Sequence, residues 1–135
     1  MSLLPKLQQR GGRLAINDGR RDLSYAALYR ASWALATTMK TKYRMAKKQP
    51  IERPRVAYMT NRDILHPMAQ FAAWHLDGVC IPLNSSSTSG ELDFFVKNSQ
   101  ADIIICHADY LKRFASLQNE LSIPIISLND AEVDL

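Results

Sequence analysis

Residues 55–84 constrain the fold more than any other stretch of the sequence. A short apolar run at 55–60 is followed by an apolar segment at 64–76 and, after Gly78, by a β-rich run at 79–83. A helix that is apolar on every side must be buried, and a strand flanked by helices usually lies in a parallel sheet. The stretch therefore predicts a strand–helix–strand crossover unit at the centre of an α/β layer.

The chain before this unit predicts a short helix, a hairpin and a longer helix. Residues 3–10 form an amphipathic segment that ends at two glycines. An Asp-Gly pair at 18–19 separates strand-like runs at 14–17 and 21–23, which is typical of a hairpin because Gly supplies the positive φ of the turn. Ser24 is expected to cap a helix with one buried face, made of Tyr25, Leu28, Ser32, Leu35, Met39 and Tyr43.

The segment that joins this helix to the central unit reads as a loop. Residues 40–54 are polar and basic and end in two prolines, which favours a solvated surface connection. After the first strand of the central unit, Asn61 and Asp63 are residues of the kind that start a helix.

The second half of the chain continues the alternation of helix and strand. The expected order is a short helix at 90–98, a strand at 101–106, a helix at 109–120, a fourth parallel-type strand at 123–128 and an acidic loop at 129–135. The apolar face of the later helix is expected to consist of Leu111, Phe114, Ala115 and Leu117. The predicted fold is thus an α/β domain with an N-terminal hairpin, a parallel sheet and flanking helices.

Four segments resemble one known family. Residues 76–84 (LDGVCIPLN) are similar to the "aGavyvPld" segment of the adenylate-forming enzymes, and residues 23–28 (LSYAAL) resemble their "LTYxEL" segment. Arg55-Val56-Ala57 followed by Asn61 matches "drVa…pNs", and residues 91–99 match "eeLayiledS". The resemblance runs collinearly over residues 14–117. It implies that residues 1–135 are an N-terminal portion of an AMP-binding, acyl-CoA synthetase-like domain, a partial subdomain of that fold.

The resemblance also implies an activity for a longer parent protein. Members of the family join a carboxylate to ATP, form an acyl-adenylate and pass the acyl group to CoA or a carrier thiol, with Mg²⁺ screening the phosphates. The segments 69–79 and 90–101 are most similar to malonyl-CoA and short-chain acyl-CoA synthetases. The family's phosphate loop, adenine segment, ribose-binding aspartate and C-terminal lysine have no match in these residues, so no catalytic residue is assigned and the isolated chain is expected to be inactive.

The serine-rich run at 85–89 resembles a phosphate loop only in composition. Small residues can bring backbone N–H groups close to phosphate, but the acidic segment Glu91-Leu92-Asp93 follows and would repel an anion. The run is therefore expected to be a plain linker.

The titratable and sulfur-containing side chains indicate no catalytic or metal site. His66 and His75 lie on the buried helix, where a cation at His75 would suit the helix dipole, and His107 ends a strand. A structural or surface role is expected for all three. Cys80 and Cys106 lie in apolar strands and have no close-spaced partner, which favours buried free thiols over a zinc site.

The charge of the chain is +4, carried largely by two basic clusters, one at 10–21 and one at 40–48. Neither is interleaved with aromatic residues as a stacking platform would be, so a solvated surface is favoured over a nucleic-acid partner. No apolar run reaches the length of a membrane span and no secretory h-region is recognised in these residues, so neither a span nor secretion is expected. An intracellular location is expected, with cytoplasm, mitochondrion and peroxisome left open. The acid-free first residues fit either a solvated helix or a remnant presequence.

Three interpretations of the chain remain open. It is a fragment of an acyl-CoA synthetase that uses ATP, Mg²⁺, CoA and a small carboxylate. Alternatively it is a non-catalytic α/β binding or regulatory protein derived from that family, or a basic module that binds nucleic acid. Because its strands suit a larger sheet, the isolated chain is expected to expose apolar surface and unpaired backbone groups at a sheet edge, and so to be marginally stable or to self-associate.

Overall fold

The computed structural model describes residues 3–61 and 63–129. Its elements are α1 (Leu3–Arg10), β1 (Leu14–Asn17), β2 (Asp22–Ser24), α2 (Tyr25–Lys47), β3 (Arg55–Met59), α3 (Leu65–His75), β4 (Val79–Pro82), α4 (Ser89–Ser99), β5 (Ile103–His107), the 3₁₀ helix η1 (Ala108–Phe114), α5 (Ala115–Leu121) and β6 (Ile125–Leu128). The predicted order of helices and strands is confirmed, and most of the expected loop at 129–135 lies outside the described residues.

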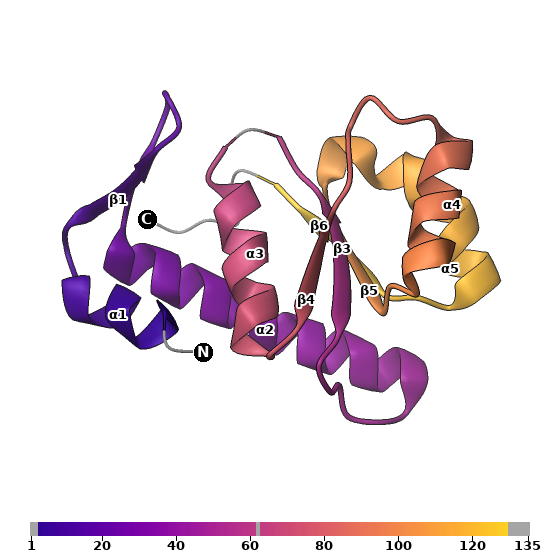
Figure 1. Ribbon diagram of the computed structural model, residues 1–135, viewed down its shortest axis with the longest axis horizontal. Helices are drawn as coiled ribbons and strands as arrows, with labels where there is room; N and C mark the ends of the chain where they lie inside the picture. Colours follow the sequence, from indigo (N-terminus) through magenta and orange to yellow (C-terminus); the bar gives the residue numbers. More distant parts are fainter. Residues whose placement is uncertain (1–2, 62, 130–135) are drawn as a thin grey trace.

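The main sheet has four parallel strands in the order β4-β3-β5-β6, and β1 and β2 form a separate antiparallel hairpin. In Figure 1 the helices α2 and α3 lie on one side of the sheet, whereas α4 and α5 lie on the other. The chain leaves β3 toward α3 and leaves β5 toward η1 and α5, so neighbouring strands send their connections to opposite faces. Such a switch point in an open α/β sheet is where ligands commonly bind.

Two hydrophobic cores follow from the alternation of side chains along the inner strands. Val56 and Tyr58 of β3 pack with α2 and α3 in the larger core. Ala57 and Met59 of the same strand point the other way and pack with α4 and α5. β5 is buried on both faces, as expected for the middle of a parallel sheet. The predicted α/β fold class is therefore confirmed.

The predicted loop at 40–54 is wrong in its first half, because α2 continues to Lys47. Met39 and Tyr43 stay on the buried face of the helix, and most residues of 40–47 are Lys, Arg, Met or Ala, which are good helix formers. Lys47 Nζ donates to the Leu121 carbonyl oxygen at 3.2 Å, which ties the end of α2 to the end of α5. Only the remainder of the segment, after the left-handed Lys48, is a connection.

The crossover unit β3–α3–β4 forms as predicted, but only β3 is central, since β4 is an edge strand of the described sheet. Asp77 takes the left-handed conformation after α3, with φ of 55°. Gly78 has a different role: a Cβ there would lie 2.6 Å from the Pro54 carbonyl oxygen. Close packing between α3 and the chain before β3 therefore requires glycine at this position.

The segment predicted as one helix at 109–120 consists of the 3₁₀ helix η1 followed by two turns of α-helix. Phe114 and Leu117 are buried as expected. Leu111 and Ala115 are exposed, so half of the predicted apolar face is wrong. The change from 3₁₀ to α geometry alters the residues per turn, and one helical period therefore cannot describe the whole segment.

Candidate functional site

A cavity of about 570 Å³ opens at the carboxyl ends of β3 and β4. Ile16, Pro67 and Leu83 supply apolar lining. Polar groups come from three loops and the start of α3; they are Asn17, Asp18, Thr60, Asn61, Asp63, His66, Asn84 and Ser85. Amide and hydroxyl groups over an apolar wall are suited to holding a small polar molecule by hydrogen bonds.

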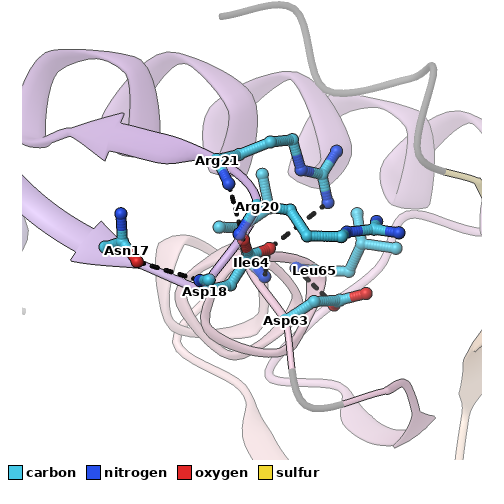
Figure 2. Close-up of polar contacts among 8 residues, drawn as sticks. Asn17, Asp18, Arg20, Arg21, Asp63, Ile64 and Leu65 are labelled. Carbon is cyan, nitrogen blue, oxygen red and sulfur yellow. Dashed lines mark hydrogen bonds and ion pairs between the residues drawn. The ribbon is translucent and has the colours of Figure 1, made fainter.

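Asp18, at the tip of the hairpin, fixes one wall of this cavity. Its Oδ1 accepts hydrogen bonds from the backbone N–H groups of Arg20 at 3.0 Å and Arg21 at 2.8 Å. Its Oδ2 accepts from the backbone N–H of Ile64 at 3.3 Å, immediately before α3 (Figure 2). One carboxylate thus closes the hairpin turn and joins the hairpin to the first turn of α3.

The same contacts hold Asp18 in its charged form. The backbone hydrogen bonds from Arg20 and Arg21 are the largest cause of a pKa for Asp18 below its usual value of 3.8, and Ile64 and the charge of Arg21 add to it. An Arg21 guanidinium nitrogen lies 3.6 Å from Oδ2. Because its oxygens are committed to these donors, Asp18 is suited to positioning rather than to proton transfer.

Asp63 stands beside this contact and starts α3. Its Oδ1 accepts from the backbone N–H of Leu65 at 3.0 Å, as Figure 2 shows. The expectation that Asp63 starts the helix is therefore confirmed. Asn61 does not cap α3; its Oδ1 accepts a hydrogen bond from the Tyr110 hydroxyl at 2.5 Å instead.

η1 braces the opposite wall of the cavity. Tyr110 binds Asn61 in the loop after β3, and the Arg113 guanidinium donates to the carbonyl oxygen of Ser85 in the loop after β4. The Arg113 guanidinium also lies over the Tyr110 ring, 5.3 Å from its centroid. These contacts hold both loops at the switch point of the sheet.

The serine-rich run at 85–89 does not fit the phosphates of ATP. Asn84 Oδ1 accepts from the backbone N–H of Ser86 at 2.9 Å. The Thr88 hydroxyl accepts a hydrogen bond from the Glu91 backbone N–H. The Glu91 carboxylate accepts one from the Thr88 backbone N–H, and the two bonds together form a capping box at the start of α4. The N–H groups of Ser86, Ser87 and Thr88 are engaged in local hydrogen bonds, and the Glu91 carboxylate stands beside them. The run is a linker that starts a helix.

Two of the three histidines lie near the carboxyl ends of the strands. His66 is exposed in the first turn of α3, with Nδ1 3.5 Å from the Thr60 hydroxyl. His107 is buried, and its Nδ1 accepts from the backbone N–H of Asp109 at 3.1 Å, which caps η1. His107 therefore has the structural role that the sequence indicates, and His66 lines the cavity.

His75 lies away from the cavity, between α2 and α3. Its Nε2 is 3.0 Å from the hydroxyl of Ser32, which is fully buried. The Ser32 hydroxyl also lies 3.0 Å from the Tyr29 carbonyl oxygen, to which it can donate, and this contact holds it within α2. Burial lowers the pKa of His75 below 6.5, so the ring is mostly neutral at pH 7, and its place between α2 and α3 fits the expected structural role.

The two cysteines are free, as the sequence indicates. Cys106 is buried, and burial raises the pKa of its thiol to about 11, while Cys80 is partly buried with a raised pKa. Within residues 3–61 and 63–129 no three His, Cys, Asp or Glu side chains gather as metal ligands. In the same part of the chain, no helix combines the length and apolar character needed to cross a membrane.

Known protein families and structures agree with the α/β fold described above. The profile of the AMP-binding enzymes matches residues 5–134. The chain belongs to the AMP-binding enzyme family. The resemblance seen in the four collinear segments is therefore confirmed, and it extends over nearly the whole sequence.

Relatives of this AMP-binding chain include malonate–CoA ligases. The mitochondrial malonate–CoA ligase ACSF3 of Mus musculus is 27% identical over 121 residues, which are 90% of this chain and 21% of that protein. Tenellin synthetase of Beauveria bassiana is 30% identical over 118 residues, 87% of this chain and 3% of the synthetase. The chain thus spans about a fifth of the length of the mouse ligase.

Solved structures of adenylate-forming enzymes share the fold. ATP-bound MatB from Rhodopseudomonas palustris superposes with a TM-score of 0.79 at 22% identity, over 96% of this chain and 25% of that one. The unliganded O-succinylbenzoate coenzyme A synthetase of Bacillus subtilis gives a TM-score of 0.72 at 17% identity, over 98% and 27%. The hairpin and parallel sheet are therefore an N-terminal part of the adenylate-forming fold.

Proposed function

We propose that residues 1–135 serve as the N-terminal portion of an ATP-dependent acyl-CoA synthetase. Such an enzyme activates a carboxylic acid as an acyl-adenylate and transfers the acyl group to CoA. The family match over residues 5–134 carries this proposal. The names of the malonate–CoA ligase relatives make malonate the first acid to test, and their mitochondrial designation makes that compartment the first to examine.

In this account the chain builds a scaffold, while ATP, Mg²⁺ and CoA are held mainly elsewhere in the parent. The described residues support that division of labour. In the serine-rich run the Thr88 N–H is held by the capping box of α4 and the Ser86 N–H is held by Asn84. The Ser32–His75 pair lies between α2 and α3, with Ser32 buried away from the cavity. The cavity at the ends of β3 and β4 supplies hydrogen-bonding groups, and among the described residues His66 contacts the Thr60 hydroxyl rather than a carboxylate.

Sequencing of the source transcript beyond the codon for Leu135 tests this proposal. A continuation into a Thr-Ser-Gly-rich loop ending in Pro-Lys-Gly is expected, because that loop supplies the phosphate contacts that residues 85–89 do not. A stop codon directly after Leu135 would favour the second function, a non-catalytic α/β binding or regulatory protein derived from the family.

A further inference from the structure

The basic cluster that the sequence shows at 10–21 is divided by the structure. Arg20 and Arg21 belong to the hairpin turn around Asp18. Arg10 and Arg13 instead join Lys6 and Gln9 around a shallow hollow of about 440 Å³ at the end of α1. Three cationic side chains and one amide line this hollow, and no carboxylate of residues 3–61 or 63–129 is part of its lining.

The backbone of the hollow is fixed to the start of α2. The carbonyl oxygen of Gly11 accepts from the Ala26 N–H at 2.7 Å, and that of Arg13 accepts from the Tyr25 N–H at 2.9 Å. The positive end of a 23-residue helix therefore lies beside the hollow and adds to its potential. The N–H groups themselves are occupied, so an anion would be held by side chains within a favourable field.

The cations are placed for a shared ligand. Lys6, Gln9 and Arg10 are three and four residues apart on α1 and so lie on one face of it, while Leu4 is buried. The Arg10 guanidinium lies 5.8 Å from the centroid of the Tyr25 ring. Among the described residues, no carboxylate forms an ion pair with Lys6, Arg10 or Arg13.

We propose that Lys6, Arg10 and Arg13 form a binding site for a phosphoryl group, separate from the cavity at the ends of β3 and β4. Guanidinium groups match phosphate oxygens with paired N–H donors, and the lysine adds a point charge. The hollow exceeds the size of one phosphate, so it accommodates a phosphomonoester with part of its organic group. That phosphoryl group comes from a free metabolite or from an anionic lipid headgroup.

Titration of the isotope-labelled 135-residue chain with glycerol phosphate, followed by amide NMR shifts, tests the site. Shifts are expected at Gln9 and at residues 10–13, and binding should weaken as salt rises. The variant Lys6→Gln/Arg10→Gln/Arg13→Gln should lose affinity by about tenfold or more. The matched variant Arg30→Gln/Lys42→Gln/Arg44→Gln removes three exposed cations from α2 and should bind as the parent chain does.

A second arm uses vesicles of phosphatidylcholine with or without phosphatidic acid. Cosedimentation that requires phosphatidic acid and is lost in the first variant identifies the lipid headgroup as the source, and binding of glycerol phosphate alone identifies a free phosphomonoester. The proposal would be overturned if both triple variants lost affinity equally. It would also be overturned if the parent chain bound neither glycerol phosphate nor the vesicles with phosphatidic acid. If the triple variant melts below the parent chain, Arg13→Gln alone replaces it, since Arg13 lies outside any helix.

Discussion

The carboxylate of Asp18 accepts a hydrogen bond from the backbone N–H of Ile64 at 3.3 Å, across 46 residues of sequence. The contact joins the hairpin to the start of α3 and so connects the small antiparallel sheet with the main one. The hairpin forms one wall of the cavity at the ends of β3 and β4. Asp18 therefore adds a direct link between that wall and α3 to the packing of the hairpin against α2.

Replacing the Asp18 carboxylate by an amide should loosen the hairpin. In Asp18→Asn an N–H₂ group takes the place of one acceptor and faces backbone donors. Faster hydrogen exchange is expected at Arg20, Arg21 and Ile64, together with a lower urea midpoint. The control Asp77→Asn changes an exposed carboxylate with a left-handed backbone, which Asn tolerates, and should leave both measurements unchanged.

The same carboxylate makes stability depend on acid. Its folded-state pKa lies below 3.8, so the unfolded chain binds the proton more readily. The contribution of Asp18 is therefore fully present above pH 3.8 and is lost as pH falls through the lower folded pKa. Urea midpoints measured across this acidic range should fall more steeply for the parent chain than for Asp18→Asn; parallel curves would contradict the assignment.

Gly78 should tolerate no side chain. A Cβ at this position would meet the carbonyl oxygens of Pro54 at 2.6 Å and Ala73 at 3.0 Å. Gly78→Ala is expected to lower the free energy of unfolding by about 1–3 kcal/mol, because two backbone segments must move apart. Gly90→Ala, which meets nothing within 4 Å, should be neutral or slightly stabilising in the same urea titration.

His75 should make stability depend on pH near neutrality. Its folded-state pKa is lowered from 6.5, mainly by burial, so the unfolded chain binds the proton first. The contribution of His75 to the free energy of unfolding should be fully present above pH 6.5 and should be lost as the pH falls through the lower folded-state pKa. His75→Gln should remove this slope from the urea midpoints, whereas the exposed His66→Gln should retain it.

Some parts of this fold could be predicted from local sequence and others could not. The hairpin follows from an Asp-Gly pair between strand-like runs, and α2 begins at Ser24 because its hydroxyl accepts from the Ala27 N–H at 3.1 Å. Both signals lie within a few residues of their effect. The end of α2 was missed because its basic surface residues suggest a loop, while the contact of Lys47 with Leu121 is 74 residues away.

The candidate site depended even more on distant contacts. The sequence marks Asp18 as a turn residue, Asn61 as a helix start and Tyr110 as part of a helix. Only the folded chain brings Asp18 to Ile64 and Tyr110 to Asn61. Aspartate in front of glycine was a usable signal for the turn, but nothing local to Tyr110 or Arg113 indicates which loop each one binds.

Self-association through the edge of the sheet remains a prediction. β4 is an edge strand of the described sheet, and Val79 at its start is 57% exposed. An uncharged edge strand offers unpaired backbone groups to another chain. Sedimentation velocity should show assembly that grows with concentration and is reduced by Val79→Lys, while Met45→Lys on α2 should have no effect. A concentration-independent monomer would contradict this prediction.

The central claim is that these residues belong to an acyl-adenylating ligase, and acid-dependent exchange of labelled pyrophosphate into ATP tests it most directly. The measurement uses the protein encoded by the complete transcript, with malonate and a panel of other carboxylic acids. Exchange that requires a carboxylic acid and Mg²⁺ is the predicted result, and the 135-residue chain alone should show none. The claim would be contradicted if the full-length protein is correctly folded and yet shows no pyrophosphate exchange with any of the acids tested.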